Sequence, residues 1–252
     1  MPTLSVIIIT KNAGTHIAKC LESVKFANEI IIVDSGSTDD TVELCKKYTD
    51  KIFIRTDWQG FGVQKNRALK KAQCDWVLSL DADEEITLNL CDEIQSAILQ
   101  SKYTAFRIPR LSRYCGRWIT HSWSSDYVLR LFKRDCAKFS NDLVHEKLEL
   151  IQGNIGQLKN IILHYSYSSL EEVIDKSNVY STAGAQMRFE KGESSSLKKA
   201  IFHGLWAFLR FYIFKKGFLD GREGFILAVS TAEVTYYRYL KLMYLQENAE
   251  KN

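Results

Sequence analysis

The sequence is poor in the features that signal linkers, disulfides and membrane spans. Two prolines and 13 glycines in 252 residues leave little material for long disordered linkers. The six cysteines form no C-x-x-C pair, and no secretory signal precedes the first expected strand at Leu4. We therefore expect reduced cytosolic thiols, no zinc site and no targeting segment. The apolar stretch 197–219 is interrupted by Arg210, Lys215 and Lys216, so it lacks the roughly 18–20 apolar residues of a membrane span.

Several catalytic signatures are also incomplete or absent. The Gly60-Phe-Gly62 segment has neither the third glycine nor the preceding strand of a dinucleotide fingerprint, and no Walker A sequence occurs. The stretch from His145 to Glu149 is not a zincin motif, because its last position is Glu rather than His. Glu85 likewise breaks the signature of an aspartyl phosphatase. These absences argue against dinucleotide, ATPase, zincin and phosphatase chemistry.

The charge is unevenly distributed along an otherwise ordinary composition, which is 46% hydrophobic and 25% charged. Residues 1–196 hold 25 Lys and Arg against 25 Asp and Glu, whereas residues 197–252 hold 9 against 5. The same end carries twelve of the thirty aromatic residues. A basic, aromatic-rich end on a neutral body indicates attraction to an anionic membrane surface, and we expect no nucleic-acid partner.

The first half alternates apolar strands with amphipathic helices. Short runs rich in Ile and Val predict strands, and the segments between them predict helices. The expected strands are 4–10, 29–34, 51–55 and 75–80. The first expected helix carries Ile17, Leu21 and Val24 on one face. The second carries Val42 and Leu44 and follows the capping residues Ser37–Asp39, and the third covers residues 62–72. This order predicts βαβ units and a parallel sheet in an α/β fold. Ligands bind beyond the carboxyl ends of such strands.

Polar residues gather at those carboxyl ends. Thr10, Asn12, Asp34, Asp81 and Asp83 each end or directly follow an expected strand. Because these ends share one edge of a parallel sheet, the sequence predicts a ligand site there.

The most informative run is Trp76–Asp83 (WVLSLDAD), where a buried strand ends in two carboxylates. Asp81 and Asp83 repel each other unless a cation lies between them. A hard divalent ion that carries a diphosphate fits, because such ions take oxygen ligands and share them with phosphates. The alternative is a solvated acidic turn, since Glu84 and Glu85 continue the charge.

Two further candidates also keep structural alternatives. Asp34 either hydrogen-bonds a nucleotide base or ribose, or forms the turn ahead of Ser35-Gly36. Lys65 opens the helix before the Asp81 strand and either contacts nucleotide or lies on a solvated helical face.

The second half has a different pattern. Residues 105–109 and 127–133 predict strands joined by a tryptophan-rich connection, residues 170–190 predict a helix, and 197–216 and 218–246 predict two more. We expect one catalytic domain over 1–196, with a donor-binding half (1–100) and an acceptor half (101–196). A basic, aromatic helical extension is expected over 197–252.

Four motifs together resemble the donor half of family-2 inverting glycosyltransferases. They are Leu4–Asn12, Ile30–Thr41 (IIIVDSGSTDDT), Gln64–Leu69 and Trp76–Glu84, in the family's order. The resemblance implies a GT-A fold, a Rossmann-like α/β fold with a mixed central sheet, here with a C-terminal helical extension. Asp126–Phe132 (DYVLRLF), Val144–Glu146 and Phe218–Phe225 (FLDGREGF) further resemble a bacterial branch. That branch includes lipopolysaccharide-core β-1,4-glucosyltransferases that act on a core heptose.

The resemblance implies a role for each donor-site residue. Thr10, Asn12 and Asp34 would hold the nucleotide, and Lys65 stands where the family commonly has Arg. Asp81 would contact the ribose, and Asp83, with Asp81 beside it, would bind Mg²⁺ or Mn²⁺ on the diphosphate. The metal would neutralise charge on the departing nucleoside diphosphate.

An inverting enzyme also needs a general base to take the acceptor proton. Glu146 is the first choice and Asp126 the second, although many relatives have Glu-Asp where this chain has His145-Glu146. The alternative for Glu146 is a surface carboxylate paired with Lys147. The histidines at 121, 145 and 164 are expected to be structural or to contact the acceptor rather than to bind metal.

The expected reaction transfers a hexose, with glucose from UDP-glucose as the first candidate, to a lipid-linked lipopolysaccharide inner-core acceptor. Alternatives are another acceptor (protein, capsule or teichoic polymer) and a non-catalytic nucleotide-sugar-binding scaffold on the membrane. Read as a helix, the stretch from Leu197 to Leu219 has an apolar face with basic residues around it, which predicts an interfacial helix. The face is formed by Ile201, Leu205, Phe208, Leu209 and Tyr212, and the basic residues are Lys198, Lys199, Arg210 and Lys215. We therefore expect a cytoplasmic protein, peripheral on the inner face of the inner membrane. The alternative is that this helix packs on the catalytic domain or on a second subunit.

Overall fold

The computed structural model of the chain describes residues 1–100, 102–123, 126–140 and 147–251. It forms two compact units. The first comprises Met1–Leu111 and Asp126–Tyr165, and the second comprises Ser112–Ser125 and Ser166–Asn252. The expected boundary after residue 196 falls inside the second unit and stays a prediction.

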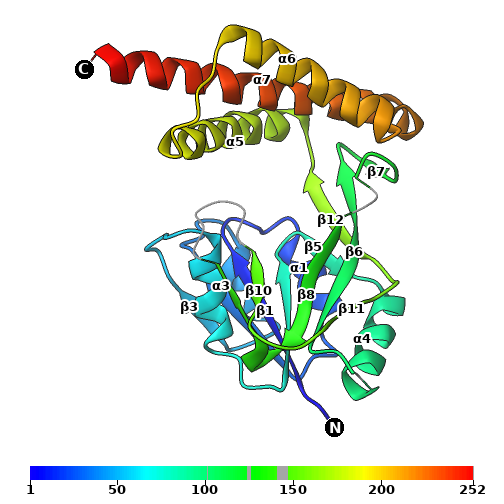
Figure 1. The fold of residues 1–252 in the computed structure, drawn as a ribbon. Helices are drawn as coiled ribbons and strands as arrows, with labels where there is room; N and C mark the ends of the chain where they lie inside the picture. Colours follow the sequence, from blue (N-terminus) through cyan, green and yellow to red (C-terminus); the bar gives the residue numbers. More distant parts are fainter. Residues whose placement is uncertain (101, 124–125, 141–146, 252) are drawn as a thin grey trace. The chain divides into compact units, whose positions relative to one another are not determined.

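The first unit is built on a mixed β-sheet (Figure 1). Its strand order is β3-β2-β1-β4-β8-β6-β12-β5, and β11 also pairs with β6. Strand β7 pairs with residues 112–114 at the end of β6, and both of these segments belong to the second unit. Strands β1 to β4 are parallel, whereas β8 runs antiparallel to both β4 and β6. The strands are β1 (Leu4–Thr10), β2 (Glu29–Asp34), β3 (Ile52–Ile54), β4 (Trp76–Asp81), β5 (Glu84–Ile86), β6 (Ala105–Tyr114), β7 (Arg117–Ile119), β8 (Tyr127–Lys133), β11 (Ile155–Gln157) and β12 (Ile162–Tyr167).

Helices cover both faces of this sheet, which explains why its central strands are apolar throughout. In β1 the side chains of Val6 and Ile8 pack in the core beside α1 (Ile17–Ser23), α2 (Thr41–Cys45) and α4 (Leu88–Gln100). Ile7 points to the opposite face, where it packs with Ala68 of α3 (Phe61–Leu69). A short 3-10 turn (Arg134–Cys136) leads into a small antiparallel ribbon of β9 (Ala137–Phe139) and β10 (Leu148–Leu150).

Several predicted elements match the structure and others differ at their ends. The expected strands at 4–10 and 29–34 are confirmed to the residue, whereas the third strand is shorter and α3 ends at Leu69. The predicted capping of α2 holds for Asp39, whose Oδ1 accepts at 3.1 Å from the N–H of Thr41, the first helical residue, although the N-cap position itself is Asp40 and has no side-chain bond. Ser37 Oγ instead accepts from the Asn12 N–H at 2.8 Å, and Asp39 Oδ2 accepts from the Gly14 N–H at 3.1 Å. These side chains join two loops at the carboxyl edge of the sheet.

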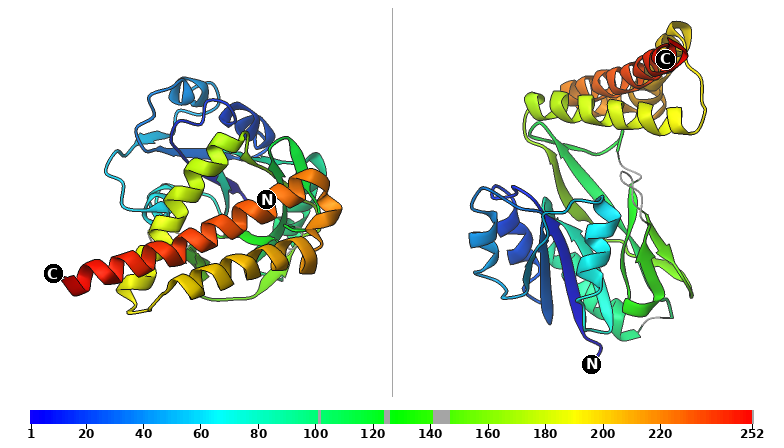
Figure 2. Two further views of the ribbon diagram at one scale, coloured as in Figure 1. Left: turned by 90° about the horizontal axis from the view of Figure 1, so that it is seen from above. Right: turned by 90° about the vertical axis from the view of Figure 1, so that its left-hand side faces the viewer.

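The second unit is mainly helical. Helices α5 (Leu170–Glu190) and α6 (Leu197–Leu209) both pack against α7 (Gly221–Lys251), as Figures 1 and 2 show. A π-helical turn (Arg210–Phe214) and a 3-10 turn (Gly217–Asp220) connect α6 to α7. The predicted helix 170–190 is confirmed, and side chains of Ser169 and Ser196 cap α5 and α6. No helix in the described part of the chain is long and apolar enough to cross a membrane.

Small residues form the buried face of α6. Ala200, Gly204 and Ala207 are its buried positions. A Cβ atom at Gly204 would lie 3.1 Å from Tyr236 Cβ and 3.4 Å from the Ala232 carbonyl oxygen, so α7 approaches the backbone of α6 closely here. The large apolar residues of α6 consequently lie on its outer face, except Phe208, which is half-buried and packs against Phe225.

Candidate active site

Three strands bring the polar residues to one edge of the sheet. Thr10 pairs in register with Asp34, and the neighbouring Ile9 pairs with Asp81. The carboxyl ends of β1, β2 and β4 therefore lie side by side, and the turns that follow them form the candidate site.

Asp34 and Asn12 shape the loops of this edge. The buried Asp34 carboxylate accepts from the N–H groups of Gly36 (2.9 Å) and Ser37 (2.8 Å) and from Ser37 Oγ (2.5 Å). Gly36 has a φ of 86°, a conformation that favours glycine. Asn12 Oδ1 accepts from the Thr38 N–H at 2.8 Å. Asp34 thus forms the turn that was the alternative to a nucleotide contact. Its contact with a nucleotide stays a prediction.

Thr10 has a side-chain hydroxyl at the same edge that makes no hydrogen bond to the described residues. The oxygen of this hydroxyl, Oγ1, is buried. Buried hydroxyls are nearly always paired with protein, water or ligand. The Thr10 hydroxyl is therefore a fitting contact for a bound molecule or an ordered water.

Asp81 is held by two buried cations. Lys65 Nζ lies 2.9 Å from Oδ1, and the Arg130 guanidinium pairs with Oδ2. Burial alone would raise the pKa of Asp81, but the charges of Arg130 and Lys65 outweigh it and hold this pKa well below its usual range. Asp81 is therefore a charged group whose two oxygens are already engaged.

Asp83 has different surroundings although it lies only two residues away. It occupies the turn between β4 and β5, and its side chain is 32% exposed. Its Oδ2 lies 3.5 Å from His164 Nε2, and its carbonyl oxygen accepts from the Tyr165 N–H at 2.9 Å. A carboxylate oxygen and an imidazole nitrogen thus face each other, and both suit a divalent ion such as Mn²⁺. The structure gives Asp83 a better geometry than Asp81 for the predicted metal role.

The described residues offer no group of three or more His, Cys, Asp or Glu side chains that could hold a metal ion alone. A metal at Asp83 and His164 would therefore need oxygen ligands from a substrate. Mg²⁺ and Mn²⁺ sites in phosphate-handling enzymes commonly have this form, with one or two carboxylates plus substrate phosphates. The residues fit a metal that arrives with a diphosphate.

Of the two candidate bases, the structure describes Asp126 but not Glu146. Asp126 directly precedes β8, and its Oδ2 accepts from Arg110 Nε at 2.8 Å and Arg110 Nη2 at 2.5 Å. Glu146, together with the adjacent His145, lies outside the described residues, so its role as the base stays a prediction. His121 belongs to the second unit, where its Nδ1 lies 3.1 Å from Asp220 Oδ1.

Sequence reasoning missed three charged residues of this edge. Glu84 was considered only as part of an acidic turn, yet its carboxylate is fully buried and contacts Arg110 and Arg130. Arg130 had a detectable signal, because it is a lone charge inside the apolar run Val128–Phe132. Arg110 directly follows Pro109 in β6 and had no comparable signal.

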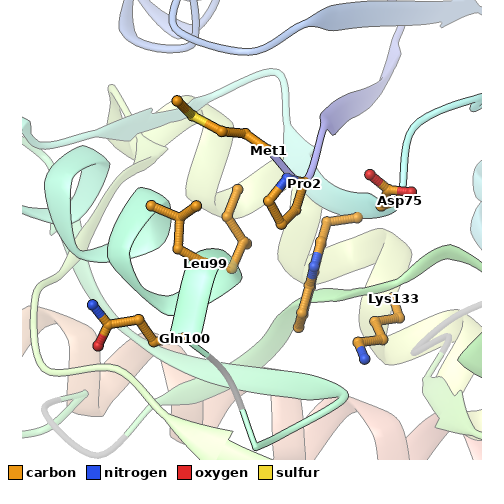
Figure 3. Close-up of a pocket in the computed structure, with 8 residues that line it drawn as sticks. Met1, Pro2, Asp75, Leu99, Gln100 and Lys133 are labelled. Atoms are coloured by element: carbon orange, nitrogen blue, oxygen red, sulfur yellow. The ribbon is translucent and has the colours of Figure 1, made fainter.

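A hollow on the described surface lies away from this edge (Figure 3). It has a volume of about 630 Å³ and is bordered by Met1, Pro2, Trp76, Leu99 and Lys133, among others. Trp76 begins β4, and Lys133, its partner in register, ends the antiparallel β8. This hollow therefore lies at the amino edge of the parallel strands, opposite to Asp81 and Asp83.

Comparison with solved structures confirms the predicted GT-A fold. The S. aureus TarS structure (residues 1–349) in complex with UDP-GlcNAc matches with a TM-score of 0.50 at 16% identity, over 97% of this chain and 92% of that one. Mannosyl-3-phosphoglycerate synthase from Rubrobacter xylanophilus gives 0.50 at 13% identity, over 76% and 75%.

Sequence comparisons identify the family. An uncharacterized glycosyltransferase of Rickettsia typhi is 32% identical over 100% of this chain and 89% of its own length. The lipopolysaccharide core biosynthesis glycosyltransferase LpsC of Rhizobium meliloti is 31% identical over 94% and 93%. The family "Glycosyl transferase family 2" matches residues 5–153. This chain belongs to glycosyl transferase family 2.

Proposed function

We propose that this glycosyltransferase moves a hexose, with glucose as the first candidate, from a UDP-sugar to a lipopolysaccharide inner-core acceptor with inversion. The observation that carries the proposal is the contrast between two neighbouring carboxylates. Asp81 is neutralised by Lys65 and Arg130, whereas Asp83 faces His164 and is partly exposed. This arrangement suits one metal ion on a donor diphosphate.

Asp83 and His164 would hold Mg²⁺ or Mn²⁺. The bound metal would offset the negative charge that develops on the departing UDP. From the sequence we expected His164 to be structural or to contact the acceptor, not to bind metal. We now propose it as a ligand, because its Nε2 lies 3.5 Å from Asp83 Oδ2. Asp81 is the weaker candidate because both of its oxygens already accept from cations.

The other donor contacts would come from the same sheet edge. Thr10 would offer its buried, unpaired hydroxyl to the nucleotide. Asn12 and Asp34 would hold the nucleotide-binding loops in shape, since their side chains bond the turn at 36–38. Lys65 would add positive charge beside the donor while it pairs with Asp81, which would face the ribose.

In the reaction the acceptor hydroxyl oxygen bonds to C1 of the sugar as the bond from C1 to the diphosphate breaks. The hydroxyl proton passes to a carboxylate of the enzyme. Glu146 remains our first choice for this base. Asp126 is second, because its Oδ2 is held by two donors of Arg110.

Relatives support the donor and the acceptor. LpsC of Rhizobium meliloti, a lipopolysaccharide core biosynthesis enzyme, aligns over nearly its whole length with this chain. TarS of S. aureus, which has the same fold, is solved in complex with UDP-GlcNAc. We therefore propose a UDP-sugar donor and a lipid-linked core saccharide as acceptor.

A donor panel tests the reaction. Purified protein is incubated with Mn²⁺ and each of several nucleotide sugars, with and without truncated lipopolysaccharide core, and UDP release and product anomer are measured. We expect UDP release from UDP-glucose, stimulated by the core, and a product of inverted configuration. Transfer only to a protein or another polymer would contradict the proposed lipopolysaccharide acceptor. Absence of both UDP binding and hydrolysis would instead favour a non-catalytic scaffold.

We also propose that α6 attaches the enzyme to the inner face of the inner membrane from the cytoplasm. Its outer face carries large apolar side chains spaced four residues apart in two adjoining rows. The exposed members are Leu197, Ile201, Phe202, Leu205, Trp206 and Leu209, followed in the π-helical turn by Ile213 and Phe214. Exposed apolar patches of this extent mark binding surfaces.

The charge around this face favours anionic lipid over a second copy of the chain. Between residues 197 and 216 the cations are Lys198, Lys199, Arg210, Lys215 and Lys216, and this stretch contains no Asp or Glu. Two copies placed face to face would bring like charges together, whereas anionic headgroups would neutralise them.

Flotation with vesicles of anionic lipid tests the membrane proposal. Phe202 and Phe214 are 65% and 66% exposed, so replacing both by Ser should remove apolar contact with the membrane but leave the fold unchanged. We expect the double variant to lose binding at least tenfold. The matched control replaces Ile174 and Val179, which are 65% and 62% exposed on α5, and should bind as wild type. Equal binding by all three proteins would show that this face of α6 does not bind the membrane.

A further inference from the structure

Six charged side chains of the first unit form a continuous line of alternating sign. Neighbours in the line are joined by ion pairs, and its members come from α3, the β4–β5 region, β6 and β8. In order the line is Lys65, Asp81, Arg130, Glu84, Arg110 and Asp126. Three positive and three negative charges cancel, so the line can be buried without a net charge.

Glu84 holds the middle of this line and the turn beside it. Its side chain is 0% exposed, and its Oε1 accepts from Arg130 Nη2 at 2.8 Å and Arg110 Nη1 at 3.1 Å. Its Oε2 accepts from the backbone N–H of Asp81 at 2.9 Å. Because Asp83 lies in the turn between Asp81 and Glu84, the Glu84 carboxylate ties the first residue of that turn to its last.

Arg130 connects this clamp to the side chain of Asp81. Its Nη2 donates to both Asp81 Oδ2 and Glu84 Oε1, and the guanidinium is almost fully buried. A guanidinium presents several donors in one rigid plane, whereas the ammonium of lysine is a single point charge on a flexible chain. The second nitrogen of the plane, Nη1, donates to Asp81 Oδ1 at 3.4 Å, so the two oxygens of Asp81 are contacted by two nitrogens while Nη2 also contacts Glu84. Lysine, with one nitrogen, cannot make this double contact with Asp81.

We propose that Glu84 and Arg130 are positioning residues for the donor, acting through Asp81 and through the turn that presents Asp83. The inference rests on the proposed donor site at those two aspartates. Glu84 fixes the backbone of the turn, and Arg130 fixes the Asp81 carboxylate that would face the ribose. Neither residue is expected to touch the reacting atoms. Partners of this kind typically contribute 10–100-fold to the affinity of the site they support, a rough general range.

Substitution of Arg130 by lysine tests the proposal. The measurement is the affinity for UDP in the presence of Mn²⁺ by calorimetry, together with the melting temperature without ligand. Arg130→Lys keeps the positive charge but loses the double contact, so we expect roughly tenfold weaker UDP binding. We also expect the donor KM to rise while the acceptor KM stays unchanged. A merely structural role would lower the melting temperature and leave the UDP affinity of the folded protein unchanged.

The matched control is Arg134→Lys, which changes a partly exposed arginine that pairs with Asp135 just after β8. It should bind UDP as wild type does. If Arg130→Lys melts below the assay temperature, Glu84→Asp makes the same test, because the shorter side chain keeps the charge but cannot span its three donors. Wild-type affinity in the folded variant overturns the positioning role alone. Absence of UDP binding by the wild-type protein overturns the proposed function, and the positioning role with it.

Discussion

The buried carboxylate of Asp220 is expected to be the main anchor of the loop 120–122 in the second unit. It accepts from the backbone N–H groups of Thr120 (2.9 Å), His121 (3.0 Å) and Ser122 (2.8 Å), and from Ser122 Oγ (2.8 Å). The perturbation is Asp220→Ala, which leaves these donors without an acceptor. The FLDGREGF motif, singled out from the sequence, thus has a structural role at this aspartate.

The magnitude follows from those bonds. A buried donor left unsatisfied costs about 1–3 kcal/mol, and Asp220→Ala would remove the acceptor of three backbone N–H groups and one hydroxyl. The contributions overlap because water can reach part of the loop. We therefore expect Asp220→Ala to lower the free energy of unfolding by about 4 kcal/mol, or the melting temperature by roughly 8–16 °C for a chain of this size.

Urea and thermal unfolding measure this change, with Asp175→Ala on the exposed face of α5 as the control. The control should differ from wild type by less than about 0.5 kcal/mol. Burial alone would raise the pKa of Asp220, but hydrogen bonds from Ser122, His121 and Thr120 outweigh it and lower this pKa. The stability from Asp220 is therefore fully present above the unfolded pKa of about 3.9 and is lost as pH falls through the folded value. A loss under 1 kcal/mol at neutral pH would refute the reasoning.

Three further substitutions test the packing of the fold. Glu29→Ala should cost about 3 kcal/mol in urea unfolding, because it removes the buried oxygen Oε2 that accepts from Ser5 Oγ (2.5 Å) and the Gln73 N–H (3.0 Å); less than 1 kcal/mol would contradict this. Asn66→Ala should cost about 2 kcal/mol by the same assay, since its amide makes bonds of 2.9 and 3.0 Å to the backbone of β9; an unchanged stability would count against it. Gly204→Leu should cost about 3 kcal/mol or more in thermal unfolding by forcing α6 away from α7, and wild-type stability would show that this approach is loose.

Much of the first unit was predictable because its signals are local. The runs LSVIIIT and EIIIVD are apolar throughout, and strands covered on both faces require that composition. The common edge of Thr10, Asp34 and Asp81 followed from the geometry of parallel strands.

The rest depends on contacts between distant parts of the chain. Strand β5 was missed because Glu84-Glu85 resembles a solvated turn, yet its partner β12 begins at Ile162. The role of Arg130 depends on the pairing of β8 with β4, which the sequence of β8 alone does not specify.

The apolar face predicted for α6 was wrong in part. Phe208 and Tyr212 are only half-exposed and pack against Phe225, whereas Phe202 and Trp206 are exposed. The close approach of α7 at Gly204 determines which side faces inward, and helical periodicity does not contain that information.

The most direct test of the central claim is UDP binding with and without Mn²⁺ by wild type and Asp83→Asn. Asparagine keeps the size of the side chain but removes the charge that would hold the metal. The account predicts that Mn²⁺ strengthens UDP binding by wild type at least tenfold, and that Asp83→Asn loses this effect and donor turnover without a change in melting temperature. The matched control, Asp92→Asn on α4, should behave as wild type. Metal-stimulated UDP binding and turnover retained in Asp83→Asn would contradict the account.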